Sequence, residues 1–136
     1  MDDIFLKIIN REIPAYIVYE DDKVIAFLDI NPVNRGHALV VPKTKFRNIL
    51  DGDSEVLAHM MKVAQKIAQA QMKELKADGV TIVMNNEPAG GQEVWHAHLH
   101  VVPRFDNDEA YQKPRHVACT DEEFVEVKEK LSEALA

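Results

Sequence analysis

The chain has 136 residues, enough for one domain with a proper hydrophobic core and too few for two comfortable ones. Its net charge of -7 argues against nucleic acid as a partner, because a polyanion would be repelled. The single cysteine, Cys119, excludes an intrachain disulfide, and no apolar run is long enough to span a bilayer. Since Met1-Asp2-Asp3 is the opposite of the basic start of a signal peptide, we expect one cytoplasmic domain over residues 1–136 that does not bind membranes.

The first part of the chain predicts a short helix and a β-hairpin. Apolar residues from Ile4 to Ile9 recur at helical spacing, so residues 3–11 are expected to form a helix that stops before Pro14. Two strand-like runs, 17–20 and 23–29, are separated by a pair of aspartates typical of a turn. Alternation along the second run places three residues on one face: Ile25, Phe27 and Asp29.

The middle of the chain predicts a strand, a long helix and another strand. Residues 37–41 are strand-like and are followed by Pro42. Helix-start residues around Asp53 precede apolar positions that recur every 3.6 residues up to Gly79. The β-branched run 80–85 is then typical of a strand.

The last part of the chain predicts a polar, irregular segment and a terminal helix. The segment extends from Asp106 to Arg115. Thr120 and Glu123 form a capping box, and the expected helix has four apolar residues on one face: Phe124, Val127, Leu131 and Leu135. The order of elements indicates an α+β fold, in which an antiparallel sheet of about five strands packs with one long helix and a C-terminal helix.

Three of the six histidines, His96, His98 and His100, alternate along one expected strand, which Pro103 is expected to end. Side chains along a strand point to opposite faces in turn, so the three imidazoles share one face. The other face, with Ala97, Leu99 and Val101, is apolar and should pack on a core.

Three interpretations of this row remain open: a solvated polar face, a zinc site, or phosphate chemistry with an imidazole nucleophile. Gly90-Gly91-Gln92 precedes the row and favours the third. Glycines let the backbone approach a ligand closely and can aim successive N–H groups at an anion.

The run His96-Ala97-His98-Leu99-His100-Val101-Val102 resembles the His-x-His-x-His-x-x signature of the histidine triad, or HIT, nucleotide-binding proteins. Further segments resemble the family in order and spacing: Ile8 to Ala15, Ala26 to Pro32 and Gly36 to Lys43. The resemblance covers roughly residues 4–105, and it implies a single HIT domain with that core and a C-terminal loop and helix at 106–136. The pattern is of the bacterial type and is similar to the purine nucleoside phosphoramidase branch.

The resemblance implies an enzyme that acts at the α-phosphorus of nucleoside phosphate derivatives. His98 would attack the phosphorus and form a covalent nucleotidyl-histidine that water hydrolyses. His96 and His100 would bind phosphate oxygens, and His37 would orient a member of the triad. The implied nucleotide-binding residues are Phe5, Ile8, Ile13, Phe27, Asp29, Ile30, Asn85, Gly91, Gln92 and Val94.

Roles within this set also follow from the resemblance. Asp29 would accept hydrogen bonds from ribose hydroxyls, while Gln92, Asn85 and backbone N–H groups near Gly91 would stabilise developing charge. The expected substrate is a purine nucleotide derivative: a phosphoramidate, a dinucleoside polyphosphate or a nucleotidyl sulfate. A regulatory nucleotide-binding module with vestigial turnover, acting through a protein partner, is the alternative, and a metal-dependent hydrolase is a third possibility.

The sequence departs from the family in two places. Many bacterial relatives bind structural zinc through a Cys-x-x-Cys pair and a later histidine, and the matching positions here are Asp3, Leu6 and Lys45. We therefore expect no structural zinc, and the reaction scheme requires no cofactor. Glu93 stands where the phosphoramidase branch commonly has Ser or Thr, which leaves the preferred leaving group open.

The family further implies a homodimer in which the sheet is extended and the long helices pack together.

Overall fold

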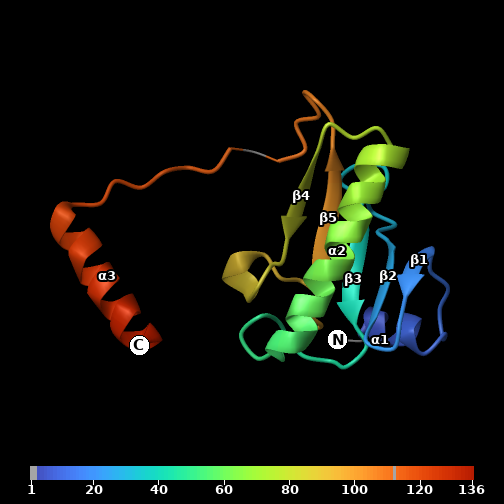
Figure 1. Cartoon of the computed structure of the whole chain (residues 1–136), viewed down its shortest axis with the longest axis horizontal. Helices are drawn as coiled ribbons and strands as arrows, with labels where there is room; N and C mark the ends of the chain where they lie inside the picture. Colours follow the sequence, from blue (N-terminus) through green and yellow to red (C-terminus); the bar gives the residue numbers. More distant parts are fainter. Residues whose placement is uncertain (1–2, 112) are drawn as a thin grey trace.

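A computed structural model describes residues 3–111 and 113–136 and confirms the α+β fold. The strands form one antiparallel sheet in the order β1-β2-β3-β5-β4 (Figure 1). In chain order the elements are α1 (Ile4–Ile9), β1 (Ile17–Glu20), β2 (Val24–Leu28), β3 (Ala38–Pro42), α2 (Ser54–Glu74), β4 (Gly79–Val83), the 3-10 turn η1 (Pro88–Gly90), β5 (Leu99–Arg104) and α3 (Asp121–Leu135). No helix in these described ranges is both long and apolar enough to cross a bilayer.

Each helix begins at a side chain that caps it. The Asp3 carboxylate accepts hydrogen bonds from the first N–H groups of α1, and Asp53 does the same for α2. Thr120 and Glu123 form the predicted capping box of α3. These local bonds explain why the helix starts could be located from sequence.

The sheet carries a hydrophobic core on each face. Helix α2 covers one face with Met60, Val63 and Ala64, which pack on apolar residues of β2, β3 and β5. Helix α1 covers part of the other face, where Phe5 and Ile8 pack on Ile25, Phe27, Leu39 and Val41. The predicted alternation is confirmed, because Leu99 and Val101 belong to the α2 core.

Both boundaries of the histidine strand differ from the prediction. Strand β5 does not end before Pro103 but continues to Arg104. Pairing between β5 and β3 stops at Val101, so Pro103 lies where β5 pairs with β4 only and its missing N–H costs no bond to β3. The strand also begins only at Leu99, so His96 and His98 precede the regular ladder.

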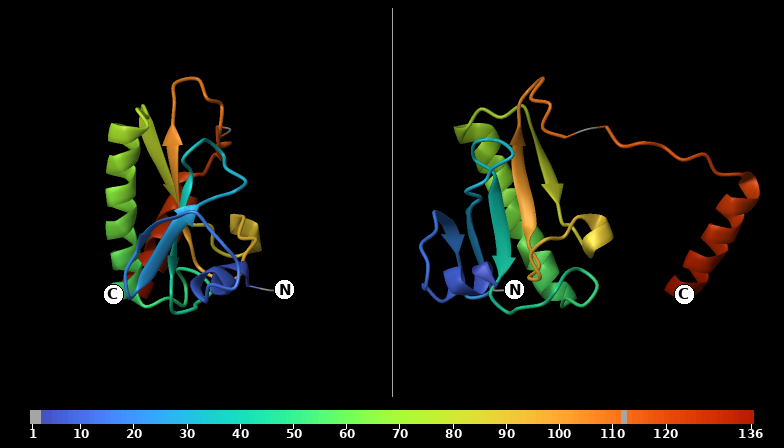
Figure 2. Two further views of the ribbon diagram at one scale, coloured as in Figure 1. Left: turned by 90° about the vertical axis from the view of Figure 1, so that its right-hand side faces the viewer. Right: turned by 180° about the vertical axis from the view of Figure 1, so that it is seen from behind.

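The C-terminal segment leaves the body of the molecule. The predicted irregular segment from Asp106 to Arg115 is confirmed, apart from Gln112, which lies outside the described residues, and the irregular chain continues to the start of α3. Helix α3 is held away from the sheet, beyond the edge formed by β4 (Figures 1 and 2). Every residue of α3 is exposed.

Candidate active site

The three histidines of the motif occupy different environments. His96 is fully buried, His98 is buried, and His100 is partly exposed. The rings of His98 and His100 pack edge to face with centroids 4.9 Å apart, and the ring of Phe5 packs at the same distance on the other side of His98. The motif therefore forms a continuous row beside α1.

His98 has the tautomer that a nucleophile requires. Its Nδ1–H donates to the His96 carbonyl at 2.7 Å, which leaves the lone pair on Nε2. Burial lowers the pKa of His98 below its usual value, although the His96 carbonyl opposes this effect. At neutral pH the ring is therefore uncharged and nucleophilic at Nε2.

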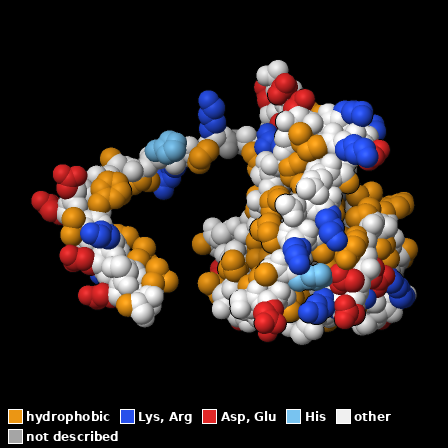
Figure 3. All heavy atoms as spheres, viewed as in Figure 1, with side chains coloured by type: hydrophobic (Ala, Val, Ile, Leu, Met, Phe, Trp, Pro, Cys, Tyr) orange, Lys and Arg blue, Asp and Glu red, His pale blue; other side chains and the backbone are white. Residues whose placement is uncertain are grey.

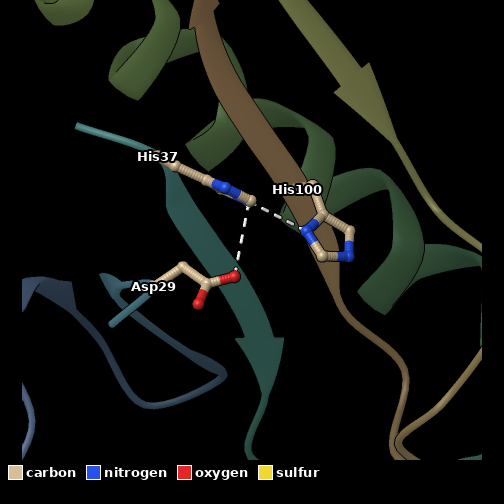
Figure 4. Close-up of side chains that lie close together, drawn as sticks. All are labelled: Asp29, His37 and His100. Atoms are coloured by element: carbon tan, nitrogen blue, oxygen red, sulfur yellow. Dashed lines mark hydrogen bonds and ion pairs between the residues drawn. The ribbon is translucent and has the colours of Figure 1, made fainter. Parts of the chain in front are cut away.

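A chain of hydrogen bonds also fixes the protons of His37 and His100. The backbone N–H of Val33 donates to Nδ1 of His37 at 3.0 Å, so His37 carries its proton on Nε2. That proton is donated to Nδ1 of His100 at 2.9 Å, which leaves the His100 proton on Nε2 (Figure 4). Burial lowers the pKa of His37, and burial with the neighbouring His98 and His37 lowers that of His100 to about 4. His100 is thus a neutral donor in the row.

The ligand atoms of Asp29, His37 and His100 lie within 4.8 Å of one another, close enough to hold a metal ion (Figure 4). The hydrogen bonds disfavour this use. A metal on Nε2 of His37 would require the proton on Nδ1, where it would face the N–H of Val33. With Asp29 3.6 Å from Nε2 of His37, the cluster fits a carboxylate that stabilises a histidine pair better than a metal centre.

His96 has no free nitrogen with which to bind phosphate. Its Nδ1 lies 2.8 Å from a carboxylate oxygen of Asp3, and its Nε2 lies 2.8 Å from the carbonyl of Pro42. Both partners are acceptors, so the ring must carry two protons and a positive charge. The expected contact of this ring with phosphate oxygens does not agree with its bonds, and its remaining link to the site is the carbonyl that holds His98.

Two of the three positions that match zinc ligands of relatives, Asp3 and Lys45, form an ion pair. The ammonium group of Lys45 lies 3.1 Å from the carboxylate of Asp3 that holds His96. Burial alone would raise the pKa of Asp3, but hydrogen bonds from His96 and Lys45 lower it overall. Neither an ammonium group nor the alkyl chain of Leu6 is a zinc ligand, so these residues do not fit a structural zinc centre.

Most of the expected base-binding residues line one apolar cleft beside α1. The cleft is lined by Phe5, Ile8, Ile13, Phe27, Asp29 and Ile30, together with other apolar side chains. Val94 packs against the same cluster. Because Phe5 touches both Phe27 and His98, the cleft is continuous with the row of histidines.

The backbone of the loop before the histidines does not fit the expected role in charge stabilisation, because the N–H groups of Gly90, Gly91 and Gln92 donate to carbonyl groups within the loop. Gly91 has a φ of +90°, a conformation that favours glycine, and it lies beside the Asn85 side chain. Glu93 is exposed.

The Gln92 side chain does not fit the expected role in charge stabilisation. Its amide nitrogen donates to the carbonyls of Arg47 and Val94, and its oxygen accepts from Asn48 and from the N–H of Glu87. All of its bonding capacity is used within the protein. Gln92 therefore holds the loop rather than reaching a ligand.

Sequence reasoning missed the network that fixes this loop. Arg47 makes a bidentate ion pair with Glu87 and stacks on Trp95 at 4.4 Å, while the buried Asn48 donates to Glu87 at 2.6 Å. Glu87 has a φ of +67°, which is unfavourable for a residue with a side chain. The partners are about 40 residues apart, so no local signal reveals the network.

Comparisons with known proteins assign the family. The HIT domain model matches residues 10–107, and the chain therefore belongs to the HIT domain family. An uncharacterized HIT-like protein of Methanocaldococcus jannaschii is 49% identical over 105 residues, which cover 77% of this chain and 81% of that protein. Adenylylsulfatase HINT3 of Arabidopsis thaliana is 36% identical over 107 residues, 79% of this chain and 54% of that protein.

Solved structures support the same assignment. A histidine triad nucleotide-binding protein from Candida albicans has a TM-score of 0.87 at 28% identity, covering 98% of this chain and 97% of that one. A zinc-bound histidine triad protein from Mycobacterium smegmatis has a TM-score of 0.78 at 37% identity, covering 98% and 96%.

One solved structure is also similar in the C-terminal arm. A HIT family protein from Bacillus subtilis has a TM-score of 0.90 at 33% identity, covering 100% of this chain and 99% of that one. Residues 113–136 are 24 of the 136 residues, so a superposition of the body alone could score no more than about 0.82. The arm and α3 of the two proteins therefore superpose as well.

Proposed function

We propose that this chain is a nucleotidyl hydrolase or transferase that acts at the α-phosphorus of a nucleoside phosphate derivative. The observation that carries the proposal is the state of His98: a neutral ring with its proton held at Nδ1 by the His96 carbonyl and its lone pair on Nε2. Attack by Nε2 forms a phosphorus–nitrogen bond, expels the leaving group and gives a nucleotidyl-histidine. Attack by water on phosphorus then releases the nucleotide and restores His98.

The neighbouring groups supply the remaining steps. The Nε2–H of His100 donates a hydrogen bond to a phosphate oxygen or to the departing atom of the leaving group and keeps its proton, and His37 holds His100 in that tautomer. The buried charge of His96 adds positive potential behind the phosphate while its carbonyl keeps His98 oriented.

The apolar cleft supplies the nucleotide site. Phe5 and Phe27 offer ring surfaces for a purine base, and Asp29 at the same cleft accepts hydrogen bonds from the ribose hydroxyls. The similarity to an adenylylsulfatase supports nucleotidyl sulfates among the proposed substrates, beside phosphoramidates and dinucleoside polyphosphates.

We also propose that the protein works as a homodimer in the cytoplasm. Strand β4 is an edge of the sheet, and Ile82 on it is exposed. The side chains of Met61 and Met72 on helix α2 are exposed, so the sheet does not cover all of the apolar surface of this helix. A second copy of the chain would cover it.

A single-turnover hydrolysis screen over the three substrate classes tests the function. We expect release of AMP or GMP from at least one class, with or without chelator. Tight binding of AMP or GMP without turnover on any class would contradict the proposal and leave a nucleotide-binding module that acts through a partner.

A further inference from the structure

Helix α3 carries an uncovered apolar face. Phe124, Val127 and Leu131 are 63%, 53% and 59% exposed and lie on one side of the helix. A helix of 15 residues is only marginally stable alone in water, so most of its stability must come from packing this face on another surface. The described part of the chain offers no surface in contact with it.

The body has a groove that matches such a helix. It lies between α2 and the β1–β2 end of the sheet, and its apolar lining includes Val18, Tyr19, Leu28, Val63, Ile67 and Ala70. Lys66 and Glu74 lie at its rim. Figure 3 shows hydrophobic side chains both along α3 and on the body beside α2.

The charges of the two surfaces are complementary. Helix α3 carries six acidic residues and two lysines, whereas α2 carries three lysines and two glutamates. The attraction comes from the lysines of α2, of which Lys66 lines the groove, and it is opposed by Glu74, which lines the groove as well.

The groove and α3 lie on opposite sides of the same chain. The groove is beside β1 and β2, whereas the arm passes the β4 edge, and views from front and behind place α3 beyond that edge (Figures 1 and 2). The similarity of the arm in the Bacillus subtilis structure shows that this outward direction is shared. The arm therefore extends away from its own groove.

A second copy of the chain would bring a groove within reach. In a two-fold dimer joined along the β4 edges, the partner's β1 lies about five strand spacings away, roughly 24 Å. The 15 residues from 106 to 120 can span up to roughly 50 Å when extended. The arm is long enough to place α3 over the far side of the partner subunit.

We propose that the two chains of the dimer exchange their C-terminal arms, so that α3 of each chain fills the groove between α2 and β1 of the other. This inference rests on the proposed homodimer and not on the proposed reaction. The apolar face of α3 covers the groove lining, and its acidic flanks lie near the lysines of α2.

Crosslinking tests the exchange directly. In a Cys119→Ser background, Ala70→Cys in the groove and Leu131→Cys on α3 are treated with a short bis-maleimide. We expect a covalent dimer on a denaturing gel. The matched control replaces Ala70→Cys with Gln69→Cys, an exposed neighbour turned about 100° around α2, which should give much less product.

The outcomes separate the possibilities. A crosslinked single chain would show that α3 folds back on its own body, and no product above the control would show that α3 does not occupy the groove. Either result overturns the exchange. If sedimentation still shows a dimer, the homodimer and the proposed reaction stand.

A second pair of variants measures the contribution of the α3 face. Phe124→Asp with Leu131→Asp should raise the dimer dissociation constant at least tenfold in sedimentation, because two charges would enter an apolar groove. Glu129→Gln with Glu133→Gln, on the opposite face of α3, should change it far less. An unchanged dissociation constant in the first pair would contradict the proposal.

Discussion

The three histidines of the motif have identical chemistry and are given different states by their partners. His98 donates from Nδ1, His100 accepts at Nδ1, and His96 donates from both nitrogens. One ring is thereby a nucleophile, one a neutral donor and one a fixed cation. The hydrogen bonds of each ring, and not the residue type, therefore determine its role.

Removing the counter-charge of His96 should destabilise the protein. Asp3→Asn leaves a buried imidazolium without its anion, which costs about 3 kcal/mol in the free energy of unfolding. Lys45→Met removes the more exposed partner of Asp3 and should cost less than about 1 kcal/mol. Denaturant titrations of both variants measure the difference, and an Asp3→Asn protein as stable as the wild type would refute the assignment of charge to His96.

The pKa shifts predict an activity that persists in mild acid. Burial lowers the pKa of His98 below 6.5 and that of His100 to about 4, so both rings stay neutral at pH values where free histidine is protonated. The profile of kcat/KM should remain flat from pH 8 to below 6.5 and fall only at lower pH, as protonation removes the lone pair of His98. The unfolded chain binds these protons more readily, so stability should also decline as pH falls from 6.5 toward 4. A drop in kcat/KM centred above pH 6.5 would be inconsistent with a buried neutral nucleophile.

At the scale of elements, the loop between β4 and β5 is held in place by side chains from the segment before α2. Arg47, Asn48 and Gln92 fix its backbone, including the unfavourable φ of Glu87. A rigid loop keeps the segment that leads into the histidines in one conformation before the substrate arrives.

Replacing one hydrogen-bond donor of this network by an acceptor should impair catalysis. Asn48→Asp keeps the side-chain shape but places a carboxylate against Glu87 and the oxygen of Gln92, which repels the loop. We expect kcat/KM to fall at least tenfold, about 1.4 kcal/mol in transition-state stabilisation. Asn107→Asp, the same change at an exposed position, is the matched control. Equal activity of the two variants would show that the network does not matter for catalysis.

The helices and strands that depend on capping residues or on the spacing of apolar residues were predictable from sequence. Capping residues and periodicity located all three helices, and alternation placed the histidines opposite Leu99 and Val101. The states of His96 and Gln92 were not predictable, because Asp3, Pro42, Arg47 and Asn48 are distant in sequence and act through single hydrogen bonds. The direction of the arm depends on packing that no local pattern encodes.

At the scale of the whole molecule, an ion pair takes the place where many bacterial relatives are expected to bind structural zinc. Asp3 joins Lys45 and His96, which link the start of α1, the segment after β3 and the histidine row. The connection holds these parts of the chain together without thiolates.

Purified protein should therefore carry well under one zinc per chain. Since Lys45 and Leu6 cannot ligate zinc, chelator should leave the thermal midpoint unchanged. Elemental analysis and thermal unfolding with chelator check this. Stoichiometric zinc whose removal lowers the midpoint would defeat the prediction.

The covalent step at His98 is the central claim, and trapping the intermediate tests it most directly. Enzyme mixed with substrate is quenched rapidly under alkaline conditions, because a phosphorus–nitrogen bond to imidazole is acid-labile but survives base, and is then digested for mass spectrometry. We expect one nucleotidyl group on the peptide that contains His98, and its loss in His98→Asn together with a fall in turnover of several orders of magnitude at nearly unchanged nucleotide affinity. An adduct on another residue, or near-normal turnover of His98→Asn, would contradict the account.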